Sequence, residues 1–310
     1  MFQATIKLLR LVVIVLAIGI FGVHSLHSQE SKAAGSGAQY VGSEACQACH
    51  EEMYNQFKKT PHYVTLTKKD YKPEQQGCES CHGPGSAHLE AEGGAGSIKS
   101  FKTMSSKERA EACLQCHARQ DDRLNFKHSE HQISQVSCDA CHSPHAPKVT
   151  ENLLRDETNN LCFTCHAEIR NSFSLPFKHK VKEGVMSCTD CHNQHGGFSA
   201  QKRLVGTDQS CFKCHSDKQG PFTFEHMAVR IEGCTYCHSP HGSNNPRLLT
   251  RNTVQSLCLE CHSGVGITPG ELPRGVDTPS FHNVATARFQ NCTTCHTQVH
   301  GSNHNRFFFE

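Results

Sequence analysis

Hydrophobic positions are concentrated near the beginning of the chain. An apolar run from Leu11 to Val23 follows Lys7 and Arg10. This run of 13 residues has the length of a signal-peptide hydrophobic region, whereas a membrane-spanning helix needs about 20 residues. The pattern predicts a Sec signal peptide over residues 1–25 and a flexible linker over 26–40. An uncleaved inner-membrane anchor is the alternative interpretation of the same run.

Beyond the run, the chain is polar and rich in turn residues. Ser105 and Glu108 have the spacing of a helix-capping box, and Thr158 and Thr207 each lie four residues before a cysteine. Elsewhere Gly, Pro, Ser and Asn dominate, as in the Gly83–Gly85 stretch. The pattern predicts short α-helices and irregular loops, with little or no β-sheet.

Composition changes this picture, because the chain lacks the residues of an ordinary core. Among 310 residues, 36% are apolar even when the 20 Cys are counted, and there is no Trp. Disordered chains are also polar, but they are poor in Cys and aromatic residues, and this chain has 17 Phe. We therefore expect a bound apolar cofactor to fill the interior.

The charge balance excludes one class of partner. With Lys7 and Arg10 removed from the 31 basic residues, 29 basic and 29 acidic residues remain. No basic stripe is present that could bind a nucleic acid.

All the cysteines belong to ten C-x-x-C pairs, and a histidine follows every pair. In c-type cytochromes the two thiols add across the haem vinyl groups, and the next residue, His, ligates the iron on the proximal face. The predicted thioether residues are Cys46, Cys49, Cys78, Cys81, Cys113, Cys116, Cys138, Cys141, Cys162, Cys165, Cys188, Cys191, Cys211, Cys214, Cys234, Cys237, Cys258, Cys261, Cys292 and Cys295. The predicted proximal ligands are His50, His82, His117, His142, His166, His192, His215, His238, His262 and His296.

Two other chemistries use C-x-x-C pairs: five zinc sites of four thiolates, or a disulfide framework. Neither requires a histidine after the second cysteine. With 24 His in the chain, ten such histidines would arise by chance on the order of once in 10^11. The sequence therefore predicts ten covalently attached c-type haems.

The motifs alternate in context, so the repeating unit is a pair of haems. In each unit the first motif is followed by a middle histidine, then by the second motif, and then closely by a trailing histidine. The decahaem domain is expected over residues 41–305, as an elongated file of haems. Its five dihaem modules are expected at about 43–90, 105–150, 155–200, 205–247 and 253–303.

The two extra histidines of each module supply one distal ligand for every iron. The predicted distal ligands are His62, His88, His128, His145, His179, His195, His226, His241, His282 and His300. His131 competes with His128, and His128 is preferred because it shares the Phe-Lys-His setting of His179. Spacing leaves open which distal histidine serves which iron.

Methionine, the other common axial ligand, occupies no repeated position. Met53, Met104, Met186 and Met227 follow the signal segment, and none recurs from module to module. The sequence predicts six-coordinate, low-potential haems with two histidines each, which leaves no iron open to a substrate. No C-x-x-C-K variant, a signature of multihaem nitrite reductases, is present. We therefore expect an electron carrier rather than an enzyme.

The five-module layout, the repeated CHSPHG and CHNQHG elements and the segment CTTCHTQVHGSNH resemble the periplasmic decahaem c-type cytochromes of the MtrA, DmsE and PioA family. The resemblance covers residues 41–305 and includes the ten motifs and the trailing residues His145, His195, His241 and His300. The resemblance to the family is least secure in the first module, in which His62 lies sixteen residues before Cys78.

The resemblance implies a periplasmic location at the outer membrane, inside a β-barrel protein. The implied partners are this barrel, an extracellular multihaem cytochrome or reductase, and a periplasmic or inner-membrane electron donor. Haem propionates would make the loaded protein acidic, so a partly basic lumen or docking surface is expected. A free periplasmic shuttle or an extracellular filament subunit is the alternative, and a multihaem reductase is a further one.

One apolar cluster falls outside this scheme. Phe307, Phe308 and Phe309 lie after the tenth motif. They could form an aromatic docking tag or could be three exposed residues without a role.

Overall fold

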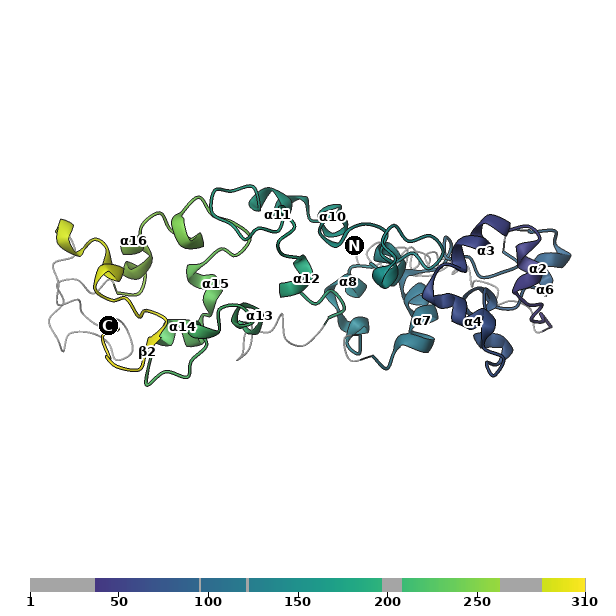
Figure 1. Cartoon of the computed structure of the whole chain (residues 1–310), viewed down its shortest axis with the longest axis horizontal. Helices are drawn as coiled ribbons and strands as arrows, with labels where there is room; N and C mark the ends of the chain where they lie inside the picture. Colours follow the sequence, from purple (N-terminus) through teal and green to yellow (C-terminus); the bar gives the residue numbers. More distant parts are fainter. Residues whose placement is uncertain (1–36, 95, 121–122, 197–207, 263–285, 310) are drawn as a thin grey trace, which may run out of the picture.

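The protein is elongated, and its segments follow one another along the long axis in chain order (Figure 1). This computed structural model describes residues 37–94, 96–120, 123–196, 208–262 and 286–309. Helices α2 (Ser43–Gln47) and α6 (Ser86–Glu90) lie near one end, and strand β2 (Gly301–Ser302) lies near the other. The predicted signal peptide and most of the predicted linker lie outside the described residues.

Helices and loops make up nearly all of the described chain. Residues 43–90 form α2, α3 (Glu51–Phe57), η1 (Pro61–Tyr63), α4 (Val64–Thr67), η2 (Pro73–Gln75), α5 (Glu79–His82) and α6. Residues 105–153 form α7 (Ser106–His117), η3 (Phe126–His128), α8 (Glu130–Ile133), α9 (Cys138–Cys141) and η4 (Glu151–Leu153). Residues 158–191 form α10 (Thr158–Phe163), α11 (Ala167–Ser172) and α12 (Cys188–Cys191).

The remaining elements belong to the last two motif pairs. Residues 209–248 form α13 (Gln209–Phe212), η5 (Ser216–Lys218), β1 (Phe224–Glu225), α14 (Met227–Ile231), α15 (Cys234–Cys237) and η6 (Pro246–Leu248). Residues 254–302 form α16 (Val254–Leu259), η7 (Ala287–Phe289), η8 (Cys292–Thr294) and β2. Within these described ranges, no helix has the length and apolar character needed to cross a bilayer.

The capping pattern accounts for the longest described helix, α7. The Ser105 hydroxyl accepts a hydrogen bond from the Glu108 backbone N–H at 3.3 Å, and the Glu108 carboxylate accepts one from the Ser105 N–H at 2.7 Å. This confirms the predicted capping box. Thr158 instead begins α10 without capping it, and Thr207 lies outside the described residues.

Side chains form only small apolar clusters. One contains Ala110, Leu114 and Phe126, and another contains Phe163, Phe173 and Val181. Both include cysteines of the haem motifs, Cys138 and Cys188, at their edges. A group attached at these cysteines would lie against the two clusters.

Successive repeats are joined through the glycine after a trailing histidine. A side chain on Gly242, whose φ is +154°, would place its Cβ 2.1 Å from the Ser172 carbonyl oxygen. A side chain on Gly301, whose φ is +145°, would place its Cβ 2.1 Å from the Phe222 ring. Only glycine permits these approaches. This explains the His-Gly ending of the repeated motifs.

Short backbone pairings lie at the same joints. Strand β1 pairs antiparallel with β2, with Phe224 opposite Ser302 and Glu225 opposite Gly301. An isolated bridge joins Phe177 to Ser243. These pairings hold the trailing residues His241 and His300 against the preceding repeat.

Candidate metal centres

The histidines of the motifs are paired with the extra histidines across short gaps. Nine motif histidines face another imidazole, with ring centres 5.9–6.4 Å apart. The pairs are His50–His88, His82–His145, His117–His62, His142–His195, His166–His131, His192–His241, His215–His179, His238–His300 and His262–His226.

This spacing fits one metal ion between each pair. A metal–imidazole bond is about 2 Å long, and the ring centre lies about 1.1 Å beyond the nitrogen. Two imidazoles on opposite sides of one ion therefore have centres about 6.2 Å apart. The residues present fit an iron held from both faces.

The pairing crosses from one repeat to the next. A middle histidine faces the first motif of the following repeat, as His62 faces His117 and His179 faces His215. A trailing histidine faces the second motif of the preceding repeat, as His145 faces His82. The exception is His88, which faces the first motif of its own repeat.

At one distal position the structure favours the alternative histidine, His131, over His128. His128 ends the short helix η3 and is exposed, whereas the imidazole that faces His166 at 6.3 Å is His131. His131 lies in α8, which is capped by the Ser129 hydroxyl. The preference for His128 rested on the local likeness of the Phe-Lys-His sequences, whereas helix α8 places His131 opposite His166.

His296 is the histidine of the tenth motif. The predicted distal ligand His282 lies outside the described residues.

Backbone carbonyls orient many of these rings through Nδ1. Among middle histidines, His131 donates to Gln194 O at 3.1 Å, His179 to Pro240 O at 2.8 Å and His226 to Val299 O at 2.8 Å. Each acceptor immediately precedes a trailing histidine. Because a carbonyl can only accept, Nδ1 carries the proton and Nε2 is left free to bind a metal. The buried Nδ1 of His62 has no hydrogen-bond partner within the described chain.

The second-motif histidines are oriented in the same way by the loops that follow them. His82 donates to Lys99 O at 2.9 Å, His142 to Asn152 O at 2.6 Å and His238 to Arg247 O at 2.8 Å. His296 donates to Phe307 O at 2.5 Å. Carbonyl contacts of this kind fix ring orientation and raise the basicity of the free nitrogen.

Burial favours the neutral form of several of these imidazoles. It lowers the pKa of His62, His145, His226 and His241, and neighbouring histidines add to the effect at each of them. Burial also lowers the pKa of His300 to about 4. Neutral imidazole is the form that binds metal.

The cysteine side chains show which motifs are neighbours. Within each repeat, the first cysteines of the two motifs lie near enough to shift the pKa of a thiol. These pairs are Cys46–Cys78, Cys113–Cys138, Cys162–Cys188, Cys211–Cys234 and Cys258–Cys292.

Across the boundaries between repeats, the second cysteines interact. Burial raises the pKa of Cys81, Cys141, Cys191 and Cys237, and cysteines of the next repeat raise it further. The cysteines that raise it are Cys116 for Cys81, Cys165 for Cys141, Cys211 and then Cys214 for Cys191, and Cys261 for Cys237. Each motif is therefore a neighbour of the next one in the sequence, from the first to the tenth.

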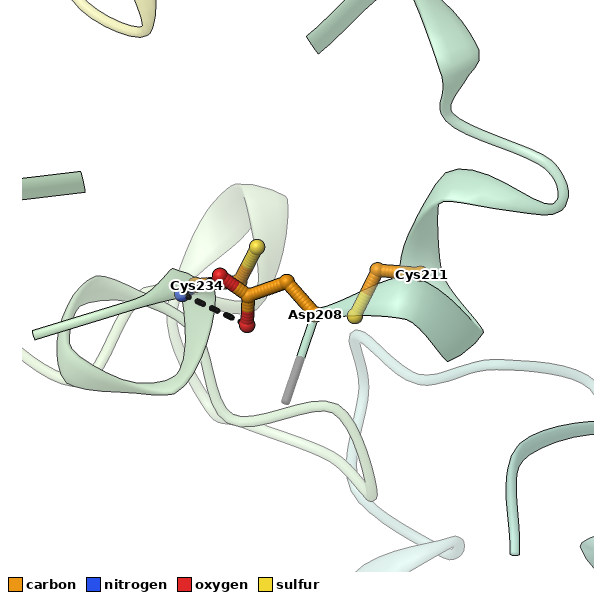
Figure 2. A group of neighbouring side chains, drawn as sticks. All are labelled: Asp208, Cys211 and Cys234. Carbon is orange, nitrogen blue, oxygen red and sulfur yellow. Dashed lines mark hydrogen bonds between the residues drawn. The ribbon is translucent and has the colours of Figure 1, made fainter. Parts of the chain in front are cut away.

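Asp208, Cys211 and Cys234 form a compact group whose ligand atoms all lie within 4.8 Å of one another (Figure 2). The two sulfurs belong to adjacent C-x-x-C-H motifs, so haem attachment would consume them. The Asp208 carboxylate accepts hydrogen bonds from the Cys234 backbone N–H at 3.2 and 3.3 Å. Its position therefore favours a structural link between two motifs over a separate metal site.

The same link recurs in other repeats, and sequence reasoning missed it. The Ser43 hydroxyl accepts from the Cys78 N–H at 3.1 Å, and the Asn159 side-chain oxygen accepts from the Cys188 N–H at 2.9 Å. Like Asp208, each acceptor lies three residues before the first cysteine of its repeat. A polar residue at this offset was the available signal, but Ala110 at the equivalent position interrupts it.

Comparison with known proteins agrees with this arrangement. A family described as "Doubled CXXCH motif" matches residues 131–171, 179–220 and 226–266. These matches begin at the three middle histidines His131, His179 and His226. A second family, "Cytochrome c554 and c-prime", matches residues 45–76 and 85–143.

A relative that matches most of the chain shows which family the chain belongs to. The chain is 32% identical over 285 residues to "Multiheme cytochrome MtrA" of Shewanella baltica (strain OS185), and the match covers 89% of this chain and 83% of the relative. The chain belongs to the MtrA family of multihaem c-type cytochromes. As a member of the MtrA family, it binds haem covalently and transfers electrons.

Proposed function

We propose that this MtrA-family chain holds ten c-type haems in five dihaem modules and conducts electrons across the outer membrane. The cofactor supplies reversible one-electron chemistry, and the polypeptide supplies spacing, ligation and electrostatics. In this proposal the nine imidazole pairs, together with His296 and His282, provide two axial ligands for every iron.

The observation that carries the proposal is the order of the motifs. Within a repeat the first cysteines of the two motifs lie near each other, and the second cysteine of one repeat lies near a cysteine of the next. Histidine pairs such as His62–His117 also join one repeat to the next. Because attachment sites that adjoin place their porphyrins side by side, the haems would form one series in chain order. That series would run along the whole length of the described molecule (Figure 1).

The ligand pairing supports a carrier rather than a reductase. A catalytic haem needs an open or exchangeable axial position. In the nine observed pairs, both sides of the gap are occupied by imidazole, and carbonyls hold several of the rings in place.

A barrel partner follows from the polar surface and the loops. The hydrocarbon core of a bilayer is about 30 Å thick, too wide for a single tunnelling step. A loop-rich chain cannot face lipid, because its backbone groups would be left without hydrogen bonds. A β-barrel with a polar lumen would enclose such a chain. We propose such a barrel as partner, with a periplasmic donor at one end and a cell-surface cytochrome or reductase at the other.

The first test is purification of the tagged holoprotein from its native host in mild detergent. The proposal predicts a stoichiometric β-barrel protein in the complex and electron transfer from a dye inside liposomes to an acceptor outside. Release of the protein into the periplasmic fraction without a barrel would instead indicate a free shuttle.

A variant distinguishes a series from independent haems. Replacing Cys162 and Cys165 by alanine removes one haem from the middle of the proposed series. Transfer across the liposome should then fall to the level of the barrel alone although nine haems remain. An unchanged rate would contradict a single series. A strong high-spin iron signal in the wild-type protein would indicate a reductase.

A further inference from the structure

The segment after the tenth motif contacts two imidazoles at once. Phe307 presents its carbonyl oxygen to Nδ1 of His296 at 2.5 Å. The ring of Phe309 stacks on the His296 ring, with centres 4.8 Å apart and planes 28° apart. The ring of Phe308 lies 5.4 Å from the ring of His226, which faces His262.

Two earlier loops have the same construction. Asn152 presents its carbonyl to His142, and Arg247 presents its carbonyl to His238. In both, a Leu-Leu pair follows the carbonyl residue, as Phe308 and Phe309 follow Phe307. The three phenylalanines therefore occupy the positions of a recurrent loop that closes a repeat.

The backbone conformation identifies the same loop independently. Asn152 and Leu153 have φ values of 55° and 54°, Arg247 and Leu248 have 59° and 60°, and Phe308 has 62°. Non-glycine residues rarely adopt this left-handed conformation, and it persists where the surrounding structure requires it. Here it turns a carbonyl towards a motif histidine.

Hydrogen bonds hold the segment in place. Phe308 O accepts from the Gln298 N–H at 2.9 Å, and the Phe308 N–H donates to Asn305 O at 3.0 Å. The Phe307 N–H donates to the Asn305 side-chain oxygen at 2.8 Å. An aromatic docking tag would extend away from the protein, whereas these bonds fold the segment back onto His296.

We propose that Phe307–Phe309 position His296 and set the redox potential of the haem that it ligates. This inference rests on the proposed haem ligation by His296. The Phe307 carbonyl makes the imidazole a stronger electron donor, which stabilises ferric iron and lowers the potential. The Phe309 ring excludes water from the same imidazole, which raises the potential because a lower local dielectric disfavours the charged ferric form.

The test of the carbonyl contact compares Phe308→Pro with Phe308→Gly. Proline cannot adopt a positive φ and has no N–H for Asn305, so the loop and its carbonyl must move. Glycine keeps the left-handed conformation without strain. In a potentiometric titration of the holoprotein, F308P should shift about one tenth of the haem absorbance to higher potential. The shift should be at most tenfold in the equilibrium constant, which is about 59 mV for one electron.

Both variants lose the Phe308 ring beside His226, so any shift caused by that loss should be common to them, and F308G should lack the further shift of F308P. Identical curves for F308P and F308G would overturn the role of the carbonyl.

The ring is tested by Phe309→Ala against Phe309→Leu, a pair that also decides the matter if F308P does not accumulate. F309A should shift about one tenth of the absorbance in the opposite direction, to lower potential, and F309L should restore most of the wild-type value. A wild-type titration curve for F309A would overturn the role of the ring.

Failure of this inference is distinguishable from failure of haem ligation. The wild-type mass and its low-spin spectrum test whether the haems are present and ligated. With these intact, unshifted variants refute only the positioning role of Phe307–Phe309.

Discussion

Replacing His131 should remove an axial ligand from the iron bound to His166, in the next repeat, and not from an iron in the repeat that contains His131. The structure pairs His131 with His166 at 6.3 Å, and its Nδ1 donates to Gln194 O at 3.1 Å. His131→Ala removes both the axial ligand and this hydrogen bond. The bond contributes about 1 kcal/mol to stability. About one tenth of the iron should change from six-coordinate low-spin to five-coordinate high-spin.

His128→Ala is the matched control. His128 is exposed and lies only three residues away, so its replacement should change stability by no more than about 0.5 kcal/mol. Its spectrum should match that of the wild-type protein.

Two assays measure the outcome. Low-temperature EPR quantifies the high-spin fraction of the oxidised protein, and carbon monoxide binding counts vacant irons in the reduced protein. H131A should bind about one carbon monoxide per molecule. Added imidazole should compete for that site and restore the low-spin spectrum. A vacant iron in H128A with none in H131A would refute the assignment of the ligand from geometry.

Two further predictions concern the joints between motifs. Asn159→Ala removes the bond from the Cys188 N–H and the two bonds that the Asn159 amide donates to Val181 O and Met186 O. It should lower the free energy of unfolding by about 2–3 kcal/mol, while Asn159→Asp, which keeps the acceptor, should lose less in the same chemical denaturation assay. Equal loss in both variants would contradict the link through the Cys188 N–H. Gly242→Ala, whose Cβ would lie 2.1 Å from Ser172 O, should displace His241 from His192 and give one high-spin haem in EPR. The control is Gly184→Ala, because Gly184 has a positive φ of 74° but open space around it. This variant should lose about 1–2 kcal/mol of stability and keep a low-spin spectrum. High-spin iron in both variants would argue against a clash between the new Cβ of the Gly242 variant and Ser172 O.

The sequence predicted the local features of the fold well. The ten motifs, the short helices and the Ser105–Glu108 cap depend on residues close together in the chain. The family followed from the repeated motifs for the same reason. These features need no knowledge of how the repeats pack.

The relations between repeats could not be predicted in this way. The partners of the four described middle histidines lie in the next repeat, as His62 and His117 show, so spacing within one repeat carries no information about them. The preference for His128 over His131 rested on local similarity and did not take the helical turn of α8 into account. The role of Phe307 depends on a backbone carbonyl, which no residue pattern reveals directly.

An anomalous diffraction map of the holoprotein at the iron absorption edge would show the number and order of the irons directly. We predict ten iron peaks in one unbranched file that follows the sequence order of the motifs, with the fifth iron between His166 and His131. The proposal of ten haems in one series would be contradicted by fewer peaks, by a branch or break in the file, or by an iron without two imidazoles.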